Sequence, residues 1–62
     1  MQSGEIIKRL KKAGWYEVAH VGSHKQFKHK TRKGRVTVPH PRKGIAIGTL
    51  KSIESQSGLK LR

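Results

Sequence analysis

Residues 22–29 read Gly22-Ser23-His24-Lys25-Gln26-Phe27-Lys28-His29, and the arrangement of the remaining chain depends on them. The Gly-Ser pair is typical of a tight turn, and the residues after it predict a strand over 24–30. Phe27 is the one large apolar residue of this strand, so we expect it to face the core. Because successive side chains of a strand point to opposite faces, the other phase, His24, Gln26, Lys28 and Lys30, then faces the open side.

A strand is expected on each side of this segment. Residues 15–21 are aromatic and β-branched, but their alternation leaves two orientations open. Either Tyr16 and Val18 point inward, or Trp15, Ala19 and Val21 do. Residues 35–40 predict a third strand with Val36 and Val38 inward, after a hairpin turn at 31–34 in which Gly34 has a positive φ. That pairing brings His40 towards His24, although the strand phase puts the two on opposite faces.

Helical spacing of apolar residues predicts two helices. The first covers 3–13, with Ser3 as N-cap and Gly14 as the left-handed residue after its end. The second covers 50–57, with Thr49 as N-cap and Gly58 at its end, and the loop at 42–48 carries two isoleucine anchors. The inward residues are expected to be Ile6, Ile7, Leu10 and Ala13 in the first helix and Leu50, Ile53 and Ser57 in the second.

These elements predict a single α+β domain over 1–62 with the order α-β-β-β-α. Both helices cover one face of a three-stranded antiparallel sheet and leave the other face open. A chain of 62 residues buries only about 60% of its unfolded surface and has no room for a deep cleft. Any active site is therefore expected on an exposed face.

The charge of the chain is one-sided, with fifteen lysines and arginines, three acidic residues and a net charge of +12. Self-repulsion at such a charge destabilises the fold unless an anionic partner relieves it. Nucleic acid is the first candidate partner, ahead of a membrane surface and an acidic protein. No apolar run reaches ten residues and no signal peptide begins the chain, so we expect no membrane span and a cytoplasmic location.

The basic residues around the second and third strands are expected to hold nucleic-acid phosphates. They are Lys25, Lys28, Lys30, Arg32, Lys33 and Arg35. A solvated surface is the simpler interpretation, but three acids are too few to offset this excess. Trp15, Tyr16 and Phe27 are all expected at the core or its edge, which argues against base stacking and favours backbone contacts.

His24 is the residue with a chemical role to offer. A histidine can take the proton from a ribose 2′-hydroxyl, and nearby cations can stabilise the charge that develops on the phosphate. No metal is needed for this route. The simpler interpretation is a surface histidine beside a turn, and local chemistry alone favours it, since no orienting acid is visible. His29, His40 or a lysine is a candidate general acid, and His20 is expected to be structural.

A metal site is not expected. The chain has no cysteine, which excludes thiolate ligands and disulfides. The four histidines are spaced by four, five and eleven residues, which matches no familiar zinc arrangement. We therefore expect no metal or other cofactor.

Four motifs together resemble the HicA toxin family of bacterial toxin–antitoxin systems. They are Ala13-Gly14-Trp15, Gly22-Ser23-His24, Val38-Pro39-His40 and Gly48-Thr49-Leu50-Lys51-Ser52-Ile53. The similarity covers essentially the whole chain.

The resemblance implies a fold like that of double-stranded-RNA-binding domains and an endoribonuclease that cleaves mRNA without a required metal. It implies that His24 is the catalytic histidine, presented by the turn at Gly22 and Ser23. It also implies a HicB-type antitoxin that masks this histidine. The alternatives are a non-catalytic RNA-binding module of the same fold and a structural or ribosome-associated basic protein.

Overall fold

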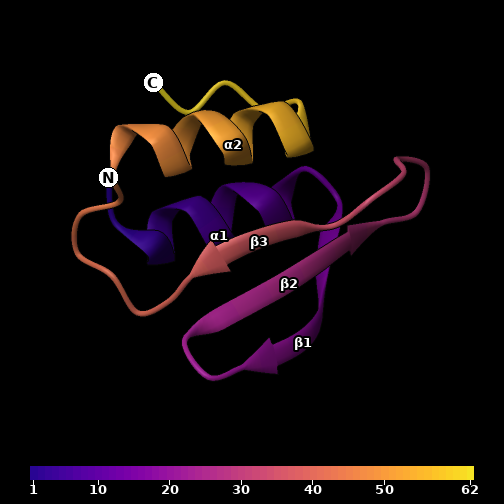
Figure 1. The fold of residues 1–62 in the computed structure, drawn as a ribbon. Coiled ribbons are helices and arrows are strands. Elements are labelled where there is room, and N and C mark those ends of the chain that lie inside the picture. The colour runs from indigo at the N-terminus through magenta and orange to yellow at the C-terminus, as the bar shows by residue number, and fades with distance from the viewer.

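The computed structural model describes all of residues 1–62 and contains two helices and three strands. Their order is α1 (Ser3–Lys12), β1 (Trp15–Val21), β2 (His24–His29), β3 (Val36–Pro39) and α2 (Ile47–Ser57). The strands form one antiparallel sheet in the order β1-β2-β3, and both helices lie on the same face of it (Figure 1). The predicted α-β-β-β-α architecture is confirmed.

The core lies between the sheet and the two helices. Phe27 of β2 and Val36 and Val38 of β3 are completely buried, as the strand phase predicts. The helices add Ile6, Ile7 and Leu10 from α1 and Leu50 and Ile53 from α2, also as predicted. Ala13 is the exception, because it lies at the C-cap of α1 and is exposed.

Strand β1 contains an irregularity that the sequence does not reveal. Glu17 pairs with Phe27, but Ala19 pairs with Gln26, so Val18 is an extra residue in β1. Such a bulge changes the phase of the strand. Trp15 therefore faces the helices, whereas Ala19 and Val21 lie on the open face with Gln26 and His24. Neither predicted orientation of β1 is correct along its whole length.

Both predicted N-caps are wrong. Gln2 is the N-cap of α1, and Ser3 is the first residue inside the helix. The Ser3 hydroxyl does not cap the helix because it is engaged by the loop after β3, where it meets His40 Nδ1 and the Arg42 N–H. Helix α2 begins at Ile47 with Ala46 as N-cap, rather than after Thr49.

The segments around α2 differ in one further respect from the prediction. Of the two isoleucines expected to anchor the preceding loop, Ile45 is buried but Ile47 is 58% exposed. Gly58 ends the helix with a φ of 76°, as predicted. Beyond it Leu59 packs against the core, and Leu61, which no periodicity in the sequence predicts to be inward, is buried as well.

Glu54 fastens this C-terminal segment to α2. Its carboxylate accepts hydrogen bonds from the backbone N–H of Leu61 at 2.7 Å and of Arg62 at 3.2 Å, and from Arg62 Nε at 3.1 Å. The bond from the Leu61 N–H, together with the charge of Arg62, lowers the pKa of Glu54 below its ordinary value of 4.5. The charged carboxylate is therefore the form that holds Leu61 in the core.

Replacing Glu54 with Gln should make the protein less sensitive to acid. A carboxyl group whose pKa is lower in the folded state stabilises the fold at pH values above its unfolded-state pKa, which is near 4.5. This stabilisation is lost as the pH falls through the folded-state pKa. Urea midpoints measured from pH 7 down to pH 3 should fall less steeply for Glu54→Gln than for the wild type. Glu5→Gln is the control, because Glu5 makes one exposed ion pair at 3.4 Å. Equal slopes for the wild type and Glu54→Gln would contradict the role of Glu54.

Gly14 is required where α1 turns into β1. Its φ is 98°, and a Cβ at this position would lie 2.8 Å from His29 Nε2. Gly14→Ala should therefore destabilise the fold by about 1–3 kcal/mol, through backbone strain and displacement of the imidazole. Gly48→Ala is the matched control in thermal unfolding, because a Cβ there meets nothing within 4 Å and an alanine in helix α2 should not lower stability.

Candidate functional site

His24 is the first residue of β2 and is exposed on the face of the sheet that the helices do not cover. It lies opposite Val21 of β1 and Pro39 of β3. The turn that precedes it depends on Gly22, which has a φ of 58°. The burial of Phe27 fixes the phase of β2 and thereby directs His24 away from the core.

The open face also carries an aromatic side chain, contrary to expectation. Tyr16 pairs with Lys28, so the two share the open face, and Tyr16 is 51% exposed. Val21, next to His24, is 65% exposed. An exposed tyrosine beside a lysine can stack on a nucleic-acid base, so the prediction that no stacking residue is available is wrong for Tyr16.

The cations of this face gather at the end of the sheet away from His24. Lys28 lies four residues along β2, which corresponds to about 13 Å at the usual rise of a strand. Arg35 immediately precedes β3, and its Nη1 donates a hydrogen bond to Gln26 Oε1 at 2.6 Å. Lys30 and Lys33 are exposed in the connection between β2 and β3. These four cations form a continuous basic end of the molecule.

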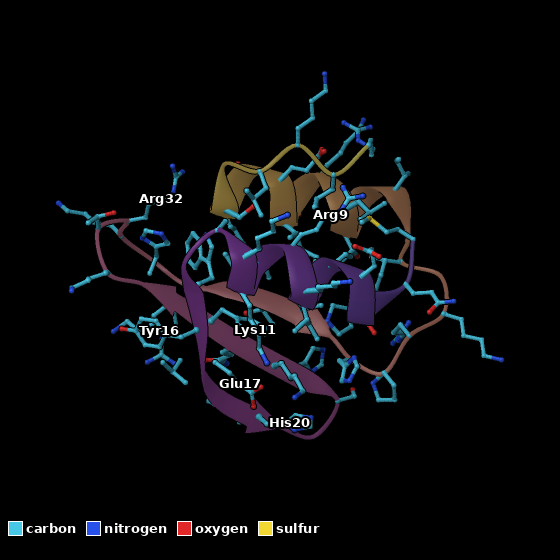
Figure 2. The ribbon with its side chains drawn as sticks, turned by 180° about the vertical axis from the view of Figure 1, so that it is seen from behind. Arg9, Lys11, Tyr16, Glu17, His20 and Arg32 are labelled. Atoms are coloured by element: carbon cyan, nitrogen blue, oxygen red, sulfur yellow. The ribbon has the colours of Figure 1, made fainter.

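Lys25 is not part of that group. It shares the helix-covered side of the sheet with Phe27, and its Nζ donates to Glu17 Oε1 at 2.9 Å. This hydrogen bond lowers the pKa of the Glu17 carboxyl, and the charges of His20 and Lys11 act in the same direction. Figure 2 shows Lys11 of α1 on the side where Glu17 and His20 of β1 lie. Lys25 is thus engaged in a separate charged cluster, and the structure does not bring it together with His24.

Arg32 also lies away from His24. Its guanidinium packs over Gly58, where an added Cβ would lie 2.8 Å from both terminal nitrogens. Gly58 ends α2, and the free carbonyl groups of a helix end attract a cation. The position of Arg32 near the end of α2, seen in Figure 2, therefore suits a capping role.

His29 is held by the fold on the helix-covered side. Its Nε2 meets the Ala13 carbonyl at 3.0 Å, and its Nδ1 accepts the Thr31 N–H at 3.1 Å. Its ring also packs on Trp15, with 5.1 Å between the ring centroids. Both ring nitrogens are occupied and the ring faces away from His24. The geometry therefore separates His29, a candidate general acid, from the open face.

His40 is closer to the candidate site. It follows Pro39, the cross-strand partner of His24, and its N–H donates to the Ser23 carbonyl at 2.7 Å. Its side chain turns to the helix side, where Nδ1 lies 2.8 Å from Ser3 Oγ. The expected proximity of His40 to the start of β2, on the opposite face, is confirmed.

Two other features bear on the class of site. No group of three or more histidine, cysteine or acidic side chains is placed to hold a metal ion. Neither helix has the length and apolar character that crossing a membrane requires.

Comparison with known proteins decides the family. A family model described as the HicA toxin of bacterial toxin–antitoxin systems matches residues 3–59, nearly the whole chain. The chain belongs to the HicA toxin family. A solved structure described as the HicA3 and HicB3 toxin–antitoxin complex contains a chain that is 38% identical, with a TM-score of 0.83 and complete coverage of both chains. A comparison with curated proteins finds no significant match. The family resemblance stated from the sequence is confirmed.

The two histidines at the ends of β2 should respond oppositely to replacement by alanine. His29→Ala removes three hydrogen bonds and the contact with Trp15, so we expect a loss of about 1–3 kcal/mol in the free energy of unfolding. His24→Ala should change it by less than about 0.5 kcal/mol, because the side chain is exposed. Urea unfolding of both variants measures the difference. A comparable loss in both would mean that His24 has a structural role.

Proposed function

We propose that this HicA-family chain is an endoribonuclease that cleaves mRNA in the cytoplasm, with His24 as the acid–base group. The observation that carries the proposal is the position of His24. It is exposed at the head of β2, on an uncovered sheet face, in a chain with a net charge of +12. A histidine so placed can reach a phosphodiester that lies on the surface without any cleft.

The chemistry needs a ribose 2′-hydroxyl. His24 takes its proton, and the oxygen attacks the adjacent phosphorus. The bond from phosphorus to the 5′-oxygen then breaks, which leaves a 2′,3′-cyclic phosphate on one product. The departing oxygen takes up a proton to become a 5′-hydroxyl. Histidine suits the first step because its charge changes near neutral pH. The proposed route calls for no metal or other cofactor.

The strand of RNA is expected to run along the open face from His24 towards the basic end of the sheet. Lys28, Lys30, Lys33 and Arg35 would hold phosphates there, and Tyr16 would stack on one base. These contacts give affinity with little sequence preference. Lys25 and Arg32, which the sequence also suggested as RNA contacts, have other partners within the chain and would contribute less.

An antitoxin of the HicB type is the proposed protein partner. The similar HicA3 chain is described in a complex with HicB3. An acidic protein that covered the open face would block His24 and relieve the charge repulsion in one step. Apolar residues on that face, Val21 and Tyr16, offer such a partner contact area next to the histidine.

A non-catalytic RNA-binding module is the second candidate function. The side-chain hydrogen bonds made by histidines involve His29 and His40, and none involves His24. A catalytic histidine is commonly oriented by a hydrogen-bonded neighbour. The binding module would use the same surface but would not cleave.

His24→Ala should abolish RNA cleavage, by at least about 100-fold in rate, because the general base is lost. The assay follows a labelled single-stranded RNA in the presence of EDTA. His20→Ala is the matched control, since His20 is exposed but lies on the other side of the sheet, and it should cleave normally. Substituting a 2′-deoxyribose at the cleaved position should also stop the reaction. Cleavage by purified His24→Ala at the wild-type rate would refute the proposal, and binding without cleavage by the wild type would favour the second candidate.

A further inference from the structure

A surface pocket lies beyond the end of β3, next to the strand end that pairs with His24. Residues 2–4 and 40–43 line it, it measures about 400 Å³, and none of its lining side chains is hydrophobic. The chain enters it directly after Pro39, the cross-strand partner of His24. In Figure 1 the segment after β3 passes the start of α1, and residues of both segments line the pocket.

The pocket carries positive charge that nothing in the chain neutralises. Arg42 and Lys43 are exposed in it. The three acidic residues of the protein form their ion pairs elsewhere, with Arg9, Lys25 and Arg62. Neither Arg42 nor Lys43 is in an ion pair with a carboxylate. Both are therefore available to an anion bound in the pocket.

The loop that bears these cations is fixed by Ser3, which is 1% exposed. Its N–H donates to the Arg42 carbonyl at 2.9 Å, and its Oγ accepts the Arg42 N–H at 2.9 Å. The same oxygen lies 2.8 Å from His40 Nδ1. One buried serine therefore sets the positions of both Arg42 and His40.

Ser3 also occupies one of the two ring nitrogens of His40. Ser3 Oγ lies within hydrogen-bonding distance of Nδ1 while it accepts the Arg42 N–H. Nε2 makes no hydrogen bond within the chain, so it is the ring nitrogen left for a ligand. Where Ser3 Oγ donates to Nδ1, the ring hydrogen lies on Nε2, which is then a donor.

We propose that this pocket binds a backbone phosphate of the RNA adjacent to the one that is cleaved. His40 donates from Nε2, Arg42 and Lys43 supply charge, and Ser3 is the positioning residue. The inference rests on the proposed function, because it assumes an RNA substrate. Lys28, the open-face cation within β2, lies about 13 Å from His24 along the strand, and Arg35 reaches back as far as Gln26. The pocket adds positive charge on the other side of His24, in the segment that follows its cross-strand partner Pro39.

The first test measures binding separately from cleavage. All variants carry His24→Ala, and a short single-stranded RNA is titrated at several salt concentrations. Arg42→Ala should weaken binding about tenfold at low salt and reduce the slope of log K against log salt by about 0.7, the loss of one phosphate contact. Lys51→Ala is the matched control, because Lys51 is exposed but does not line the pocket, and both quantities should stay unchanged.

The second test separates a hydrogen-bond donor from a general acid at position 40. The side-chain amide of glutamine can replace Nε2–H as a donor but cannot transfer a proton. In the background that retains His24, His40→Gln should therefore cleave RNA within about threefold of the wild type. His40→Ala should raise KM with kcat little changed. A large fall in kcat for both variants would overturn the donor role in favour of acid catalysis.

The third test concerns Ser3. If it acts through His40, Ser3→Ala should weaken RNA binding less in a His40→Ala background than in the parent chain. A purely structural role would give the same loss in both. The measurements are made well below the unfolding temperature of each variant.

Failure of the inference and failure of the proposed function give different results. Wild-type protein that cleaves RNA, together with Arg42→Ala and His40→Ala variants that keep full affinity and salt slope, would overturn the pocket alone. Wild-type protein that neither binds nor cleaves RNA would overturn the function on which the pocket rests. The Arg42 side chain is exposed, so weaker RNA binding by Arg42→Ala would not be explained by loss of folding.

Discussion

The side chain of Phe27 is completely buried between β2 and the helices, and its position sets the orientation of every other side chain in β2. Glu17 and Val36 are its cross-strand neighbours, so the same choice of face is imposed on the adjoining strands. A shift of one residue would bury His24 and expose Phe27. Burying one phenyl ring stabilises the fold by about 1.5–3 kcal/mol, a large share of what a domain of this size has available. The exposure of His24 is therefore a consequence of the core.

The strands whose phase depends on a single buried face were predictable. β2 and β3 have clear apolar residues on one phase, and the structure agrees with both. β1 was not predictable beyond Trp15, because the bulge at Val18 changes the phase without leaving a mark in the composition. The buried Leu61 was missed for a related reason, since its place depends on the Glu54 carboxylate and on no local periodicity.

The site was predictable in outline but not in its charges. His24 follows from strand phase, and the basic character of the chain follows from composition. Which cations are available to a ligand is decided by partners distant in sequence. Lys25 meets Glu17, and Arg32 meets Gly58, through contacts that only the folded chain creates. The exposure of Tyr16 was allowed by only one of the two orientations left open for β1, and the need of a small core for aromatic residues argued against it.

The three acids illustrate how the positive charge is distributed. Glu5, Glu17 and Glu54 each pair with a cation on the helix side or at the C-terminus, and none lies on the open face. The acids thus neutralise cations on the helix side and at the C-terminus, and leave the positive charge around His24 and in the pocket beyond Pro39 without an ion pair.

Ser3, the residue expected to cap α1, also contributes to the pocket. Ser3 gives up helix capping, worth about 1 kcal/mol, and instead joins the first turn of α1 to the loop that carries Arg42. The position of that loop is then coupled to the core through Ile6 and Leu10 of the same helix.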